Sequence, residues 1–163
     1  MPASRDELFS RLAELKIETR TKDHAPVYTV EEARALRGDI PGGHCKNLFL
    51  KDKKGALWLV VTPEDAKVDL KTLPGRIGAA RISFGKAELL LEVLGVEPGS
   101  VTPFALINDK ETRVNVILDE SMMANELVNY HPLKNDATTS IAPDDLVAFI
   151  KSCGHDPKIV AVA

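Results

Sequence analysis

The chain has 163 residues, of which 44% are hydrophobic and 28% are charged, and its formal net charge at pH 7 is −3. This length suits one domain with a single sizeable core, and the acidic balance excludes a globally basic nucleic-acid binder. The charge is uneven, because residues 46–86 carry 9 basic and 4 acidic side chains whereas residues 87–163 carry 5 and 12. A basic middle segment indicates either a docking surface for an anionic partner or an ordinary solvated surface.

Several classes of protein are excluded by the bulk features. No apolar run approaches the roughly 18–20 residues of a membrane span, and the N-terminus has no signal-peptide pattern. Cys45 and Cys153 form no CxxC pair, so we expect neither a disulfide framework nor a zinc ribbon. We therefore expect a cytoplasmic protein with one domain over residues 1–163.

Local patterns predict alternating short helices and strands. Capping boxes at Ser4–Glu7 and Thr29–Glu32 predict two helix starts. In chain order we expect a helix over 5–16, a strand over 17–22, a helix over 29–38, a hairpin of strands over 46–51 and 57–62, a helical turn over 69–73, a short strand or loop over 81–84 and a helix over 86–94.

The second half repeats this mixture. We expect strands over 104–107, 114–118, 138–141 and 159–162, a helical or loop segment over 122–126, and a helix from Pro143 to Gly154. Helices interspersed with hairpin-like strand pairs predict a mixed α+β fold, with a central mixed, largely antiparallel sheet flanked by short helices.

Familiar catalytic motifs are missing, since the sequence contains no P-loop, no GxGxxG, no GxSxG and no HExxH. The adjacent His44 and Cys45 raise the alternative of a thiol nucleophile. Neighbouring side chains on a strand point to opposite faces, however, so we expect Cys45 to be a packing residue.

Three segments are unusual for a purely structural domain. A Gly-rich turn leads into Lys46 at the start of a strand, where a phosphate or solvent would suit the ammonium equally well. Residues 99–103 form a GxxxP loop in which glycine permits close backbone approach and proline fixes the exit. Residues 129–140 are rich in polar side chains, which indicates either a turn network or the wall of a pocket.

Taken together, these segments resemble the YbaK/ProX family of aminoacyl-tRNA editing domains. Within that family the chain is most similar to the free-standing deacylases that clear mischarged alanine from proline tRNA. The matching stretches cover nearly the whole chain in order: His24–Ala33, Gly43–Asp52, Arg81–Phe84, Gly99–Asp109 and Asn129–Ile141.

The resemblance implies a YbaK-like fold and a hydrolase that uses neither a metal nor a cofactor. Water would attack the aminoacyl ester, with help from the ribose hydroxyl. Lys46 would hold the phosphate of the terminal adenosine, and backbone amides of the loop formed by Gly99, Ser100, Val101, Thr102 and Pro103 would face the ester carbonyl. The implied pocket residues are Val30, Asn47, Phe49 and His131.

The resemblance also implies partners. Lys51 and Arg81 would contact the acceptor end of the tRNA. Lys53, Lys54 and Arg76 extend this candidate set, with a solvated hairpin turn as the alternative explanation of Lys53 and Lys54. Prolyl-tRNA synthetase or an elongation factor is a further candidate partner, whereas DNA and membranes are not. Two alternatives stay open: a deacylase for cysteine on proline tRNA, and a non-catalytic module that binds tRNA or the synthetase.

Overall fold

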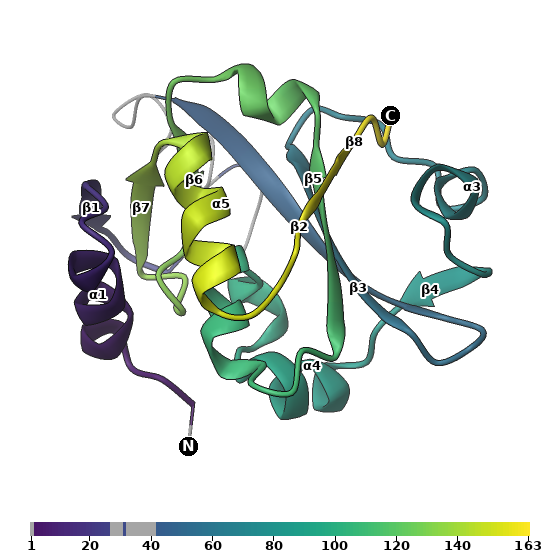
Figure 1. Cartoon of the computed structure of the whole chain (residues 1–163), viewed down its shortest axis with the longest axis horizontal. Coiled ribbons are helices and arrows are strands. Elements are labelled where there is room, and N and C mark those ends of the chain that lie inside the picture. The colour runs from purple at the N-terminus through teal and green to yellow at the C-terminus, as the bar shows by residue number, and fades with distance from the viewer. Residues whose placement is uncertain (1, 27–30, 32–41) are drawn as a thin grey trace.

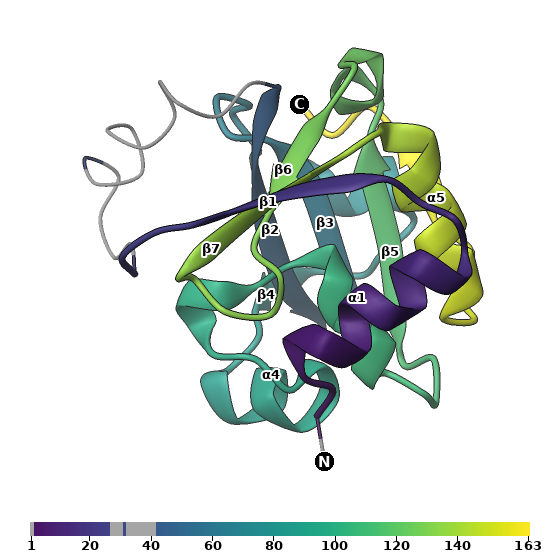
Figure 2. The same cartoon turned by 90° about the vertical axis from the view of Figure 1, so that its left-hand side faces the viewer.

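A computed structural model describes residues 2–26, 31 and 42–163. Eight strands form one sheet in the order β1-β7-β6-β2-β3-β5-β8, with β4 paired to β2 off this path (Figures 1 and 2). Four pairings are antiparallel and three are parallel, which confirms the predicted mixed sheet. The strands are β1 (Thr19–Asp23), β2 (Gly43–Asp52), β3 (Leu57–Pro63), β4 (Ile82–Phe84), β5 (Val114–Asp119), β6 (Val128–Tyr130), β7 (Ala137–Ile141) and β8 (Lys158–Val160).

The described helices are short. Four are α-helices, namely α1 (Arg5–Glu14), α3 (Leu73–Ile77), α4 (Ala87–Leu94) and α5 (Pro143–Ser152), and three are 3-10 helices, namely η1 (Pro98–Ser100), η2 (Pro103–Asn108) and η3 (Ser121–Ala124). The predicted capping box of α1 is confirmed, because the Ser4 hydroxyl accepts from the Glu7 amide at 3.2 Å. None of the described helices has the length and apolar character that crossing a membrane requires. The helix predicted over 29–38 lies, apart from Glu31, outside the described residues.

The strand predicted over 104–107 is wrong, because this segment forms the 3-10 helix η2. Thr102 caps the helix by accepting from the Phe104 amide at 3.2 Å, and Pro103 suits a first helical position. Phe104 and the two residues after it are fully buried, so the run is apolar because the core surrounds it. The helical turn expected over 69–73 is confirmed, because the amides of Thr72 and Leu73 donate to the Asp69 carbonyl at 3.1 and 2.9 Å, and α3 follows directly from Leu73.

Two hydrophobic clusters pack on opposite faces of the sheet. The larger cluster includes Leu12 of α1, Leu90 of α4, Phe104 of η2 and Phe149 of α5. The smaller cluster lies around α3 and the C-terminus and includes Leu50, Trp58, Val60, Leu73, Ile77, Ile82, Ile117 and Val162. The strand β2 therefore separates two different environments.

Candidate functional site

Lys46 and Asn47 are neighbours on β2 that project from opposite faces of the sheet. Successive side chains on a strand alternate between faces. The register with β3 places Asn47 opposite Val61, a member of the larger cluster, whereas Val60 belongs to the smaller cluster. Asn47 and Phe49 thus share the face covered by α4 and η2, and Lys46 lies on the α3 face.

The Lys46 ammonium is held by a backbone acceptor. Its Nζ atom donates to the carbonyl oxygen of Ala66 at 2.6 Å, in the segment between β3 and α3. The side chain is half-buried. An ammonium carries three N–H donors, so this bond orients Lys46 and leaves two donors for a ligand.

The loop from Gly99 to Pro103 lies beside the polar segment 129–140. A Cβ atom at Gly99 would lie 3.6 Å from Nδ2 of Asn135, and Val101 packs against the larger cluster. The Ser100 amide donates to the Glu97 carbonyl at 2.8 Å. The Ser100 amide is thereby engaged within the loop, which leaves the amides on either side as the candidates to meet a developing oxyanion.

His131 lies in the same polar segment and is half-buried. Its Nδ1 atom is 2.8 Å from the carbonyl oxygen of Ala137, and because a carbonyl only accepts, Nδ1 carries the hydrogen and Nε2 keeps its lone pair. Burial lowers the pKa of His131, the ring of His24 acts in the same direction, and the Ala137 carbonyl and Asp136 oppose this shift. The two imidazole rings meet edge to face with centroids 6.3 Å apart. His131 is therefore a neutral acceptor near pH 7.

The start of β2 is fixed by Asn129 and Ser140 of the polar segment 129–140, for which the sequence analysis gave no individual role, and by Asn125, which it did not single out. Asn129 donates through Nδ2 to the Gly43 carbonyl at 3.1 Å, and its Oδ1 accepts from the buried Ser140 hydroxyl. A Cβ atom at Gly43 would lie 2.8 Å from Nδ2 of Asn125, so glycine allows the close approach of this segment. The Gly-rich turn before β2 is recognisable in the sequence. No local pattern, however, indicates that Asn125 and Asn129 pack against this turn.

Cys45 is a protonated thiol near neutral pH. Burial raises its pKa to about 11, although hydrogen bonds from Tyr130 and the Asn129 amide act in the opposite direction. Its Sγ atom donates weakly to the Gly43 carbonyl at 3.8 Å. Because the thiolate is the nucleophile, this environment supports the expectation that Cys45 is a packing residue.

Lys51 and Arg81 lie together beside β4. The register pairs Lys51 with Ser83, two residues beyond Arg81, and the Arg81 carbonyl accepts from the Lys53 amide at 2.8 Å. Both cations line a groove of about 820 Å³ that also contains Lys53 and Lys86. The acidic side chains of Glu88 and Glu92 on α4 form part of its lining.

The hairpin that carries Lys51 is held by the buried carboxylate of Asp52. One Asp52 oxygen accepts from the amides of Lys54 and Ala56, and the other from Trp58 Nε1 at 3.1 Å and from the Ala80 amide at 3.4 Å. Asp52 therefore positions both the hairpin that carries Lys51 and the segment before β4 that carries Arg81. In contrast, Arg76 donates to the Ala161 carbonyl near the C-terminus.

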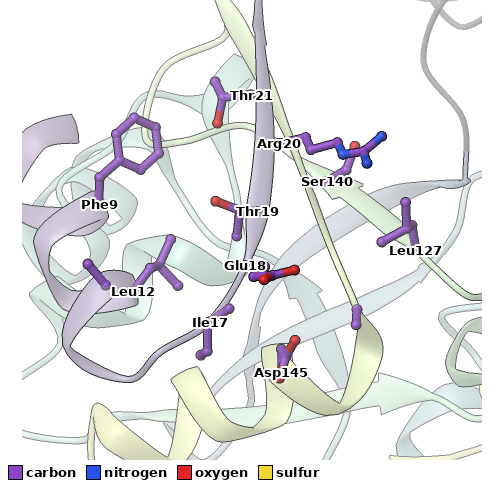
Figure 3. A pocket seen from close by; sticks show the side chains of 12 residues that line it. Phe9, Leu12, Ile17, Glu18, Thr19, Arg20, Thr21, Leu127, Ser140 and Asp145 are labelled. Atoms are coloured by element: carbon purple, nitrogen blue, oxygen red, sulfur yellow. The ribbon is translucent and has the colours of Figure 1, made fainter.

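A cavity of about 840 Å³ lies elsewhere, between α1, β1 and the start of α5 (Figure 3). Phe9, Leu12 and Ile17 form its apolar side, and Arg20 and Asp145 are among its charged residues. None of the candidate site residues that the structure describes lines this cavity. Val30, the remaining predicted pocket residue, lies outside the described residues. Within 2–26, 31 and 42–163, no group of three or more His, Cys, Asp or Glu side chains could hold a metal ion.

Comparison with known proteins assigns the family. The model of the aminoacyl-tRNA editing domain matches residues 24–149. The chain is 35% identical over 158 residues to the prolyl-tRNA editing protein ProX of Acetoanaerobium sticklandii, covering 96% of each chain. It is 39% identical over 159 residues to the prolyl-tRNA synthetase associated domain-containing protein 1 of Danio rerio, covering 96% of this chain and 86% of that protein.

Solved structures agree in fold. A crystal structure of a candidate trans-editing enzyme for prolyl tRNA synthetase superposes with a TM-score of 0.69 at 18% identity and covers 100% of both chains. The editing-domain model spans most of the chain and includes Lys46, the Gly99–Pro103 loop and His131. The chain belongs to the family of aminoacyl-tRNA editing domains.

Proposed function

We propose that the chain is a trans-editing deacylase that hydrolyses alanine from mischarged proline tRNA. The observation that carries the proposal is the placement of the Gly99–Pro103 loop beside the segment containing His131, within a chain of this family. The names of the relatives, which refer to prolyl-tRNA editing and to prolyl-tRNA synthetase, support proline tRNA as the substrate.

In the proposed mechanism the two faces of β2 have different tasks. Lys46 holds the phosphate of the terminal adenosine with the donors that its bond to Ala66 leaves over. The loop amides stabilise the negative charge on the ester oxygen, and each such donor is commonly worth about 3 kcal/mol. Water attacks the ester, assisted by the neighbouring ribose hydroxyl, and no protein nucleophile takes part.

Selection between alanine and proline follows from size. A closed pocket excludes the larger prolyl group by steric overlap, whereas an apolar pocket gains only about 1–3 kcal/mol per methylene. Asn47, Phe49 and Val30 are the proposed walls, together with the neutral His131. Phe49 is only 5% exposed, and its ring packs against Gly85, so this wall is rigid.

The acceptor end of the tRNA is proposed to lie along the groove that contains Lys51 and Arg81. Such contacts with phosphates orient the tRNA and make binding dependent on salt, without reading its sequence. Recognition of the whole tRNA through prolyl-tRNA synthetase or an elongation factor is part of the same proposal.

The test offers alanyl-, cysteinyl-, seryl- and prolyl-charged proline tRNA to the enzyme in parallel. We expect the alanyl ester to be cleaved fastest and the prolyl ester to be spared. Preference for the cysteinyl ester would reassign the substrate. Binding of tRNA without cleavage of any ester would overturn the enzymatic proposal.

A further inference from the structure

Phe84 is the one exposed phenylalanine, tyrosine or tryptophan among the residues that the structure describes. Its exposed fraction of 62% is also the largest of any exposed large hydrophobic residue there. The other described aromatic side chains are buried or half-buried, namely Phe9, Phe49, Trp58, Phe104, Tyr130 and Phe149. Burial of a phenylalanine is favourable, so the stability of the fold gives no reason for an aromatic residue at this exposed position.

The backbone that carries Phe84 is fixed. β4 lies beside the hairpin of β2 and β3 (Figure 1), and its antiparallel register with β2 places Phe84 opposite Leu50. Directly after Phe84, the Gly85 amide donates to the Phe49 carbonyl at 2.9 Å. A ring on a fixed backbone loses little conformational freedom when a ligand binds. The exposed ring of Phe84 is therefore a preorganised contact surface.

Phe84 lies on the same face of the sheet as Lys46. Residues directly opposite each other in an antiparallel pair share a face, so Phe84 shares the face of Leu50, a member of the smaller cluster. Lys46 has the parity of Leu50 on β2 and projects from this face too. Four residues along a strand cover about 13 Å and adjacent strands lie about 5 Å apart, so the backbones at Lys46 and Phe84 are about 14 Å apart. A few nucleotides of single strand can cover this separation.

The groove beside Phe84 is positively charged. Its lining includes four cations, namely Lys51, Lys53, Arg81 and Lys86. Of its acidic residues, Asp52 is buried and accepts hydrogen bonds from the chain, Glu92 pairs with Arg113 at 3.0 Å, and Glu88 remains. The four cations therefore outweigh the acidic groups. Two copies of the chain meeting at Phe84 would bring the same cations together, and this repulsion disfavours a second copy as the partner.

An exposed aromatic ring among cations is the combination that binds single-stranded nucleic acid, because the ring stacks on a base while the cations bind phosphates. A tRNA ends in unpaired nucleotides, and the last of them carries the amino acid. We propose that Phe84 stacks against an unpaired base that precedes the terminal adenosine. The stacked base positions the strand between the groove and Lys46. This inference rests on the proposed deacylase function and adds the residue that orients the single-stranded 3′ end.

The test is a double-mutant cycle between Phe84 and each unpaired base that precedes the terminal adenosine. Alanyl-charged proline tRNA is prepared with an abasic nucleotide at one of these positions at a time. The kcat/KM of each substrate is measured for the wild type, for Phe84→Ala and for Phe84→Trp, which keeps an aromatic ring. Ile159→Ala is the matched control, because Ile159 is a 52% exposed hydrophobic residue on β8, outside the groove. The ratio of intact to abasic substrate within one variant is independent of the folded fraction.

We expect one abasic position to lower kcat/KM at least about fivefold in the wild type, in Phe84→Trp and in Ile159→Ala. The same position should cost Phe84→Ala little, because this variant has already lost the stacking contact. Equal losses in the wild type and Phe84→Ala at every position, or no loss at any position, would overturn the inference while leaving the deacylase function intact. In that case, self-association that sedimentation detects in the wild type and not in Phe84→Ala would assign the ring to a second copy. If the wild type did not cleave the intact alanyl ester, the proposed function itself would be refuted.

Discussion

The Nε2 atom of His155 lies 2.9 Å from Oδ2 of Asp109, and both side chains are 2% exposed. The Asp109 carboxylate also accepts from the amides of Arg113 at 3.1 Å and Val114 at 2.9 Å. Burial raises the pKa of Asp109, but the hydrogen bonds from His155 and the two amides outweigh it and hold the pKa below its usual range. This contact ties the segment after α5 to the start of β5.

The Asp109 carboxylate should therefore stabilise the fold at neutral pH and lose this effect in acid. A carboxyl with a lowered folded pKa stabilises above its unfolded pKa, here near 3.8, and the contribution disappears as the pH falls through the folded pKa. We expect Asp109→Asn to lower the free energy of unfolding by about 1–3 kcal/mol at neutral pH. Urea unfolding at neutral and acidic pH measures the difference, which should shrink in acid; an equal loss at both would contradict the assignment.

Lys46→Ala should reduce deacylation while leaving the fold intact. Removing a cation from a phosphate contact commonly costs 2–5 kcal/mol, so kcat/KM should fall about thirtyfold or more. The matched control is Lys67→Ala, because Lys67 is an exposed lysine just after Ala66. Steady-state deacylation together with circular dichroism checks both variants, and full activity of Lys46→Ala would remove this residue from the mechanism.

The salt dependence of activity should report on Lys51 and Arg81. Each phosphate contact contributes about one unit to the slope of log affinity against log salt concentration. We expect Lys51→Ala and Arg81→Ala each to lower kcat/KM and to flatten this slope by about one unit. Lys151→Ala serves as the control, since Lys151 is an exposed lysine in the last turn of α5. Slopes that match the wild type would exclude the groove as the tRNA contact.

Gly85→Ala should disturb the wall that Phe49 forms. A Cβ atom at Gly85 would lie 2.4 Å from an atom of the Phe49 ring, and this ring is almost fully buried. Overpacking of this kind costs about 1–3 kcal/mol, which urea unfolding can measure. Gly75→Ala is the matched control, because nothing lies within 4 Å of its Cβ position. A Gly85 variant as stable as the control would show that the ring moves freely.

Cys45→Ser should remain active. The pKa of the Cys45 thiol, raised to about 11 by burial, leaves almost no thiolate at neutral pH. Deacylation assays of Cys45→Ser and of Cys153→Ser should both give rates near the wild type. Selective loss of activity in a folded Cys45 variant would restore the thiol mechanism.

Local signals were sufficient for most of the elements. The capping box at Ser4, the turn at Gly55 and the helix end at Gly95 each depend on groups only a few residues apart, and each is present in the structure. The segment 104–107 was mispredicted because a short apolar run has the same pattern in a buried 3-10 helix as in a strand.

The candidate site depends on contacts that no local pattern contains. The bond from Asn129 to Gly43 joins residues 86 positions apart, and the short strand β6 that carries Asn129 was not predicted. Alternation along β2 does predict that Lys46 and Asn47 face opposite ways. Which face the Gly99–Pro103 loop covers is decided by packing of the larger cluster, and Val101 contributes to that packing.

The placement of Lys46 and Asn47 on opposite faces makes the length of β2 critical. Asn129 secures one end of the strand at Gly43, and Asp52 secures the other end at the hairpin. With the register kept from Gly43, inserting or deleting one residue between Gly43 and Lys46 would exchange the two faces, turning Lys46 toward the larger cluster and Asn47 toward α3. Substitutions in this strand can tune the site one side chain at a time, whereas a change of length would invert it.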